Sequence, residues 1–161
     1  IFEFGDRRVG AVMTPGTAVF ALSNSLPMGR VLAEVKKNHF SRIPIYQGAP
    51  HRIVGILYAK DLVATSYRLE GRKVRLADLL HPVFFVPRGV TCAQLFVEFR
   101  RRMTHLAVVV DEYGAMLGVV TMEDLLEELF GEIRDEKEVP HPTGEFGGGA
   151  PPPDLDGGGL P

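Results

Sequence analysis

Cysteine is nearly absent from this chain of 161 residues, which contains Cys92 alone. A lone cysteine excludes a disulfide within the chain and a cysteine-based metal site, and it fits a reducing compartment. Long apolar runs are also missing, because no stretch approaches the roughly 18 residues that cross a bilayer. No signal peptide is recognisable. The chain begins at Ile1 rather than Met, so we expect a fragment or a processed form of a longer protein.

The chain also lacks an excess of charge of one sign. Its formal net charge of −2 gives no bulk attraction to nucleic acid or to anionic lipid. We therefore expect no nucleic-acid partner and no direct membrane insertion. The one basic cluster, Arg100–Arg102, is typical of cations at a helix C-terminus.

Patterns of catalytic and metal-binding residues are missing as well. No GxSxG, P-loop, paired-carboxylate or Cys–His arrangement stands out, so we expect a protein that is not an enzyme. The histidines show no spacing typical of metal ligands; they are His39, His51, His81, His105 and His141. We therefore expect no metal site built by the protein alone.

One phrase occurs twice, as GILYAKDL from Gly55 to Leu62 and as GVVTMEDL from Gly118 to Leu125. The copies lie 63 positions apart, and the same spacing places 41–45 over 104–108. A repeat of this length indicates one folding unit used twice. Since a half of roughly 60 residues would be marginal alone, we expect the two halves to pack on each other.

Each half is predicted to contain a strand, a helix, two strands and a helix. In the first half these elements are expected at 19–22, 27–39, 42–46, 53–58 and 61–69, with Pro27 in the first turn of its helix. In the second half they are expected at 83–86, 91–103, 106–110, 116–120 and 122–130, with a turn at 111–114. Strands this apolar need cover from helices, which predicts an α/β or α+β fold with helices on small sheets.

The composition changes near Pro140. Seven glycines and six prolines lie between Pro140 and Pro161, and such a segment has little to bury. We expect residues 137–161 to form a disordered or extended tail.

The tandem β-α-β-β-α unit, with Gly-apolar-apolar-Thr-x-x-Asp between its last strand and last helix, resembles the cystathionine-β-synthase (CBS) domain pair. Four motifs make the resemblance narrower: VMTP at 12–15, FSRIPIY at 40–46, VVDEYG at 109–114 and VTMEDLLEELFGEI at 120–133. They are similar to those of the hemolysin-related, CorC-type magnesium and cobalt efflux proteins. The resemblance implies CBS repeats at 8–69 and 74–134, packed as a pseudo-twofold pair.

Thr121 and Asp124 allow two interpretations. A Thr-x-x-acid pattern at a helix start can form a capping box, in which the two side chains satisfy free N–H groups without any ligand. The same helix N-terminus favours phosphate, and a carboxylate beside it can accept both hydroxyls of a ribose. The resemblance implies this second role, in a site for an adenosine nucleotide.

The resemblance also implies that a cleft is built from both repeats. The matching positions in this chain are Ser23, Phe40, Ser41, Arg42, Ile43, Pro44, Thr121 and Asp124. Arg42 is expected to reach phosphate through charge-assisted hydrogen bonds, or else to be a solvated charge at a strand end. Ile43 and Pro44 are expected either to pack in the core or to leave backbone groups that contact an adenine edge. AMP and ATP remain open as ligands, with Mg²⁺ arriving on the phosphates.

The first copy of the phrase has Tyr58 where the second has Thr121, although Asp61 matches Asp124. A Tyr ring cannot cap a helix in the same way, and it crowds the space that a sugar needs. We therefore predict a degenerate second cleft around Tyr58, Asp61, His105 and Leu106. One cleft of the two is expected to bind nucleotide well.

The resemblance implies a regulatory domain pair that binds an adenosine nucleotide and acts on a transmembrane transport domain, at the cytoplasmic face of the cell membrane. It also implies a homodimer formed through the CBS pairs. Two alternatives remain open: a regulatory CBS module of a soluble enzyme, and a purely structural dimerisation module without ligand.

Overall fold

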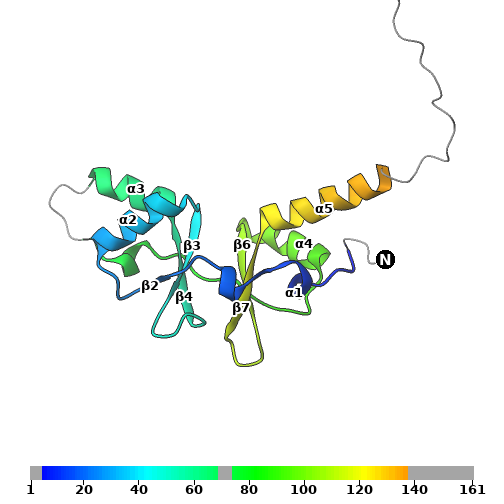
Figure 1. Cartoon of the computed structure of the whole chain (residues 1–161), viewed down its shortest axis with the longest axis horizontal. Helices are drawn as coiled ribbons and strands as arrows, with labels where there is room; N and C mark the ends of the chain where they lie inside the picture. The colour runs from blue at the N-terminus through cyan, green and yellow to red at the C-terminus, as the bar shows by residue number, and fades with distance from the viewer. Residues whose placement is uncertain (1–4, 69–73, 138–161) are drawn as a thin grey trace, which may run out of the picture.

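The computed structural model describes residues 5–68 and 74–137 (Figure 1). The expected tail falls almost entirely outside this range, as does the last residue of the helix expected at 61–69. Within the range no helix combines the length and the apolar character needed to span a membrane.

The two halves contain the same five elements in the same order (Figure 1). The first half contains β2 (Leu22–Ser23), α2 (Met28–Asn38), β3 (Arg42–Tyr46), β4 (Ile53–Tyr58) and α3 (Ala59–Arg68). The second half contains β5 (Phe85–Pro87), α4 (Cys92–Arg102), β6 (Leu106–Val110), β7 (Met116–Thr121) and α5 (Met122–Lys137). The predicted order is therefore confirmed, and the mixed α/β class with helices on small sheets is confirmed with it.

The boundaries of several elements differ from those expected. The first strand of each half lies further along the chain than predicted, because only its end reaches a partner strand. Pro27 is the N-cap of α2 and lies outside its first turn. The helix α5 runs on to Lys137, beyond the predicted end at residue 130.

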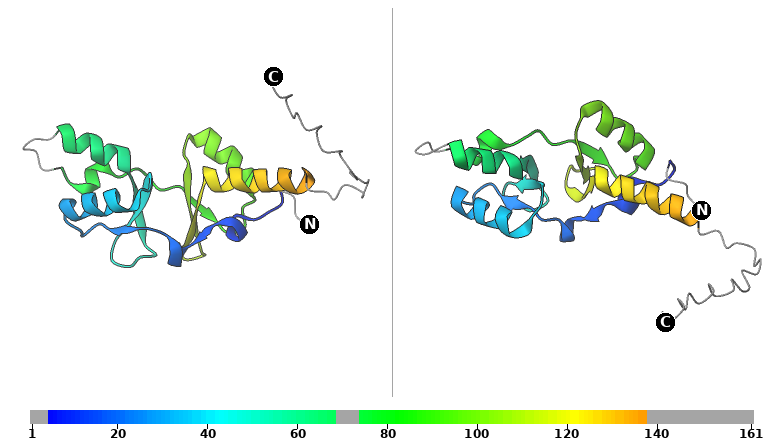
Figure 2. Two further views of the ribbon diagram at one scale, coloured as in Figure 1. Left: turned by 45° about the horizontal axis from the view of Figure 1, so that its top comes forward. Right: turned by 90° about the horizontal axis from the view of Figure 1, so that it is seen from above.

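The strands form two small sheets, each belonging mainly to one half. One has the order β2-β3-β4 and the other β1-β7-β6-β5, where β1 is Thr14–Pro15. The sheets lie at the centre of the molecule, and the helices of each half lie on the outer side of its own sheet (Figures 1 and 2).

The two halves exchange the segments that precede them in the chain. The segment before the first half packs on the second half, and the segment before the second half packs on the first. The short helix α1 (Val9–Val12) and β1 pack on the second half, where Val9 is fully buried in the core and Thr14 pairs with Val119. In return, the 3₁₀ turn Leu76–Leu79 packs on the first half, where Leu76 joins the core.

This exchange explains the glycine that begins each copy of the repeated phrase. A Cβ on Gly118 would collide with the carbonyl oxygen of Thr14, and a Cβ on Gly55 would lie 2.7 Å from Cδ1 of Leu80. A side chain at either position would push away the segment contributed by the other half. The repeated glycine is therefore the position at which the segment contributed to each half lies closest to that half's strand.

The repeat spacing is not constant along the chain. Arg42 faces Tyr58 in the first hairpin, and Leu106 faces Thr121 in the second. Tyr58 and Thr121 are 63 positions apart, whereas Arg42 and Leu106 are 64 apart. The extension of the 63-residue spacing back to residues 41–45 was therefore wrong, because the second hairpin turn is one residue shorter than the first.

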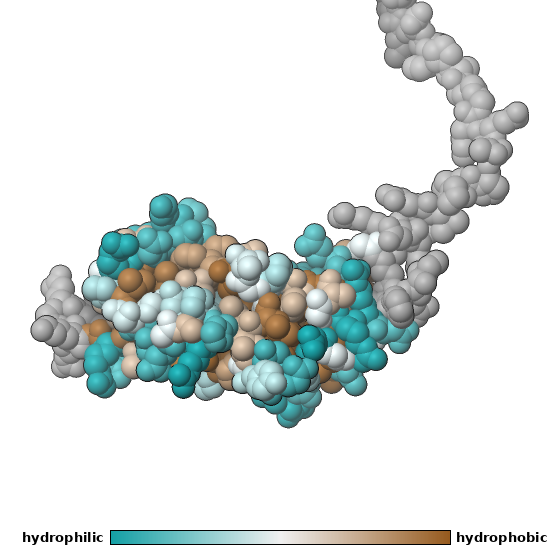
Figure 3. Space-filling model, turned by 60° about the horizontal axis from the view of Figure 1, so that its bottom comes forward, coloured by the Kyte–Doolittle hydropathy of each residue, from teal (hydrophilic) through white to brown (hydrophobic). Residues whose placement is uncertain are grey.

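Three apolar clusters hold the fold together. One lies within each half, around Phe99 in the second and Ile43 in the first. The third joins the halves and includes Ile56, Leu106 and Val119. Further apolar residues remain at the surface over both halves, between hydrophilic rims (Figure 3).

Candidate functional site

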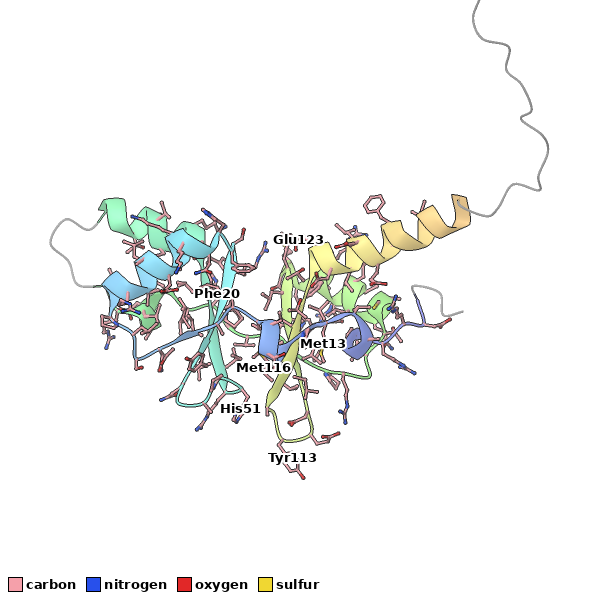
Figure 4. The ribbon with its side chains drawn as sticks, viewed as in Figure 1. Met13, Phe20, His51, Tyr113, Met116 and Glu123 are labelled. Atoms are coloured by element: carbon pink, nitrogen blue, oxygen red, sulfur yellow. The ribbon has the colours of Figure 1, made fainter. Side chains whose placement is uncertain are left out.

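A hollow of about 350 Å³ opens between the two halves, at the small end of the range typical of ligand pockets. Its walls come from the segment before β2, the start of β3, the strands β6 and β7, and the first turn of α5. The lining residues are Thr14, Ala18, Val19, Phe20, His39, Phe40, Ser41, Arg42, Pro44, Leu106, Val119, Thr121, Glu123 and Asp124. Phe20 and Glu123 mark its two sides in Figure 4.

The first half contributes an aromatic wall. Phe20 and Phe40 are stacked, with ring centroids 5.3 Å apart and planes 17° from parallel. Phe40 is half exposed, and it follows His39, which ends α2 in the left-handed conformation with φ of 54°. That turn brings Phe40 back toward Phe20. A stacked aromatic pair with one half-exposed ring offers a flat surface on which a planar base can stack.

Pro44 keeps one edge of this wall open. In the second half, the N–H of Val108 donates to the carbonyl of Phe84 at 2.8 Å and fastens β5 to β6. Pro44 is the counterpart of Val108 in the first hairpin, and proline has no N–H to donate. The segment before β2 therefore pairs with β3 only from Leu22 onward. Pro44 lines the hollow at this edge, and the contact of nearby backbone groups with an adenine edge stays a prediction.

The second half contributes the helix start. The N–H of Thr121 donates to Oδ2 of Asp124 at 2.9 Å, and the N–H of Asp124 donates to Oγ1 of Thr121 at 3.2 Å. The predicted capping box is therefore present. Both side chains also line the hollow, so the capping arrangement and a ligand-binding role are compatible.

Arg42 supplies positive charge to the hollow. Its side chain is 23% exposed and its Nη1 lies 3.8 Å from Oε1 of Glu123, a loose ion pair. Its guanidinium also lies 6.0 Å from the ring centre of Tyr58, within the range of a cation–π contact. The alternative of a freely solvated charge at the strand end is wrong for Arg42. A phosphate entering here would compete with Glu123.

A second hollow of about 480 Å³ adjoins the first along residues His39 to Arg42. Lys60 contributes a second cation there, with its Nζ 5.7 Å from the ring centre of Tyr58. Lys60 corresponds to Glu123 in the repeat. The two hollows together can hold a flat group at one end and several negative charges at the other.

The structure brings together most of the predicted site residues. Phe40, Ser41, Arg42, Pro44, Thr121 and Asp124 all line the first hollow. Two predicted residues lie elsewhere: the hydroxyl of Ser23 hydrogen bonds with Ser25 at 2.8 Å, and the side chain of Ile43 is fully buried in the core. Leu106 was assigned to the second cleft but lines the first.

Sequence reasoning missed part of the lining. Thr14, Ala18, Val19, Phe20 and Val119 line the hollow without having been predicted. Thr14 lies in the VMTP motif and Val119 in the repeated phrase, but neither motif indicates by itself that its residue lines a hollow. Glu123 also lines the hollow and was not among the predicted site residues.

Where the second cleft was predicted, His81 contacts two of the expected residues. Asp61 and Tyr58 lie together as predicted, but both contact His81, with Nε2 2.7 Å from Oδ2 of Asp61 and the imidazole stacked on the Tyr58 ring. His105 is exposed, and its carbonyl accepts from the N–H of Met122.

The resolved pKa shifts all belong to groups outside the first hollow. Hydrogen bonds from Arg101 and then Arg102 lower the pKa of Glu98 to about 2, and burial raises the pKa of the Cys92 thiol. Over residues 5–68 and 74–137, no group of three or more His, Cys, Asp and Glu side chains is placed to hold a metal ion.

Comparison with known proteins places the chain in a family. The model of the CBS domain matches residues 9–67 and 76–131. Hemolysin C of Brachyspira hyodysenteriae is 37% identical over 134 residues, which cover 83% of this chain and 48% of the relative. A UPF0053 protein of Mycobacterium tuberculosis is 37% identical over 138 residues, covering 84% and 32%. The chain thus spans about half or less of these relatives.

Solved structures agree with the sequence relatives. The CBS domain of a bacterial CNNM/CorC family Mg²⁺ transporter in complex with ATP has a TM-score of 0.73 and 35% identity, covering 81% of this chain and 92% of that one. A CBS-domain pair with bound AMP from Klebsiella pneumoniae has a TM-score of 0.65 and 25% identity, covering 78% and 99%. The chain belongs to the CBS domain family, as a CBS pair similar to Hemolysin C and to the CBS domains of CNNM/CorC family Mg²⁺ transporters.

Proposed function

We propose that this chain is a regulatory module that binds one adenosine nucleotide in the hollow between its halves. The observation that carries the proposal is the meeting, in one hollow, of an aromatic wall, the Asp124 carboxylate and the Arg42 cation. These are partners for a base, a ribose and a phosphate respectively. Solved relatives that carry ATP and AMP support the same ligand class.

The nucleotide is proposed to lie with its base against Phe20 and Phe40 and its edge toward the backbone beside Pro44. The ribose hydroxyls would donate to Asp124, and Thr121 would contact the sugar or the first phosphate. The phosphates would then reach Arg42 in place of Glu123. Mg²⁺, where present, would arrive on the phosphates, whose oxygens suit that ion.

The proposed mechanism is a shift between relative arrangements of the two halves. A ligand that touches residues of both halves stabilises the arrangement in which those residues meet. At a ligand concentration of about 100 times the dissociation constant, the bound arrangement gains about 2.7 kcal/mol. Regulation of this kind requires no catalytic group, and we propose no enzymatic activity for the chain.

Calorimetric titration of AMP, ADP and Mg-ATP tests the proposal. Wild type is expected to bind, and Asp124→Ala is expected to bind at least about tenfold more weakly, since a charge-assisted hydrogen bond contributes roughly 1.5–3 kcal/mol. Asp124→Asn keeps a capping oxygen and separates loss of the cap from loss of the carboxylate. Asp78→Ala, which removes an exposed carboxylate of the 3₁₀ turn Leu76–Leu79, is the control. Unchanged binding by both Asp124 variants would remove the assigned site.

The parent protein is proposed to be a membrane-associated exporter of divalent cations such as Mg²⁺ or Co²⁺, with this module on the cytoplasmic face beside the transport domain. The names of the relatives support this assignment. If the parent protein is instead a soluble enzyme, its sequence should contain no membrane-spanning stretch. A purely structural module predicts no thermal stabilisation by AMP, ADP or Mg-ATP.

A homodimer through the CBS pairs is also proposed, and the outer face of α5 supports it. Leu126, Phe130 and Ile133 recur at helical spacing and are 37%, 57% and 39% exposed. Burying such a stripe favours association. Analytical ultracentrifugation is expected to give a dimer for wild type and a monomer for Phe130→Glu. A monomeric wild type at high micromolar concentration would refute the dimer.

A further inference from the structure

In the predicted second cleft, a histidine that is 41% exposed stands where the first hollow has a threonine. Thr14 faces Val119 across β1 and β7, and His81 faces Ile56 in an isolated antiparallel bridge. Val119 and Ile56 are the same position in the two copies of the repeated phrase. His81 is therefore the counterpart of Thr14.

The imidazole of His81 uses the groups that a nucleotide would need in this cleft. Its Nε2 lies 2.7 Å from Oδ2 of Asp61, the counterpart of Asp124. Its ring stacks on Tyr58, with centroids 3.9 Å apart and planes 13° from parallel. A planar heterocycle that stacks and also bonds the carboxylate occupies the cleft much as a bound ligand would.

The backbone holds His81 in this position. The N–H of His81 donates to the carbonyl of Ile56 at 2.8 Å, and the N–H of Ile56 donates to the carbonyl of His81 at 3.0 Å. Leu80, directly before it, packs tightly on Gly55. A side chain on so fixed a backbone gives up little conformational freedom when it docks. An incoming ligand would have to displace it.

The surroundings of the second cleft favour closure in other ways. Leu106 is the counterpart of Arg42 in the second hairpin, although its side chain lines the first hollow. The second half therefore supplies no cation at the position that matches Arg42. The bond from Val108 to the carbonyl of Phe84 closes the edge that Pro44 leaves open. Lys60 and Arg42 lie by the Tyr58 ring, but both border the hollows already described.

We propose that His81 determines the number of nucleotides this chain binds, by occupying the second cleft as an internal ligand and leaving only the first hollow open. The inference rests on the proposed nucleotide-binding function. It assigns a role to a histidine that the sequence alone shows only as one of several scattered histidines.

Titration of AMP into matched variants tests the assignment. The variants are His81→Thr, which copies Thr14, and Tyr58→Thr/His81→Thr, which also copies Thr121. His81→Gln keeps a hydrogen-bonding side chain without the ring, and it guards against a threonine variant that fails to fold. His51→Thr, on the first hairpin turn, is the control (Figure 4). Calorimetry counts the sites, and amide NMR shifts at Asp61 and Asp124 show which cleft responds.

Wild type and His51→Thr are expected to bind one AMP per chain, with shifts at Asp124 alone. The double variant is expected to bind a second AMP at least tenfold more weakly than the first AMP, with new shifts at Asp61. Folded His81 variants that all keep one site and an unresponsive Asp61 overturn the proposal, and so does a wild type with two equal sites. A wild type without any site overturns the proposed function, and the inference then stands only if the double variant gains binding at Asp61.

Discussion

Replacing the repeated glycines by alanine tests how closely the exchanged segments pack on Gly55 and Gly118. A Cβ on Gly118 would collide with the Thr14 carbonyl, which is backbone, and would lie 2.9 Å from Sδ of Met13. A Cβ on Gly55 would meet only side-chain atoms of Leu80, the nearest at 2.7 Å. Rotation can move Cδ1 of Leu80 away but not its Cβ, which would lie 2.8 Å from the new methyl group, so the backbone at residue 80 must shift slightly. Thr14 can move only if β1 leaves its place on β7.

The magnitudes follow from these contacts. Overpacking costs roughly 1–3 kcal/mol, and loosening β1 loses hydrogen bonds of about 0.5–1.5 kcal/mol each. Against this, alanine in a strand gains roughly 0.5–1 kcal/mol over glycine. We expect Gly118→Ala to lower the free energy of unfolding by about 2–3 kcal/mol, and Gly55→Ala by about 1 kcal/mol. For a domain of this size the melting temperatures should fall by about 8–12 °C and about 4 °C respectively.

Urea and thermal unfolding, followed by circular dichroism, measure both variants. Because Thr14 lines the first hollow, Gly118→Ala should also weaken AMP binding, whereas Gly55→Ala should leave it nearly unchanged. A Gly118→Ala chain as stable as wild type, or one that loses no more stability than Gly55→Ala, would refute the close contact between β1 and Gly118 of β7.

Two further predictions concern α4. Thr91→Ala removes one side of the capping box with Gln94 and should lower the free energy of unfolding by about 1 kcal/mol. Urea unfolding measures the loss, with Thr17→Ala as the control variant. Equal urea midpoints for the two variants would contradict the prediction. Burial raises the pKa of Cys92 above its ordinary value of 9.0, so the unfolded chain loses the thiol proton first and stability should fall as the pH rises through 9.0. Between pH 8 and pH 10 the urea midpoint should fall further for wild type than for Cys92→Ala. An identical pH dependence in both chains would contradict this prediction.

Local signals predicted the elements whose pattern is complete within a few residues. The strands β3, β4 and β6 begin and end where expected, because each is a short, mainly apolar segment with a turn at one end. The capping box of Thr121 and Asp124 was also readable, since its two members lie in one helical turn. These features depend on neighbours along the chain.

The features that were missed depend on contacts between distant residues. The pairing of Thr14 with Val119 leaves no trace in the local pattern around either residue. The contact between His81 and Asp61 crosses twenty positions of chain. The change from 63 to 64 in the repeat spacing comes from the length of one turn, which composition does not reveal. Only one of the two rings of the aromatic wall was predicted, namely Phe40 and not Phe20.

The exchange of leading segments between the halves has a consequence for chains cut in two. A fragment ending at residue 68 would carry α1 and β1, which belong to the other half, and would lack the turn at Leu76–Leu79 that completes its own core. A fragment starting at residue 74 would have the opposite defect. Neither piece should fold well alone, but the two mixed together should reassemble, each supplying the strand or turn that the other lacks.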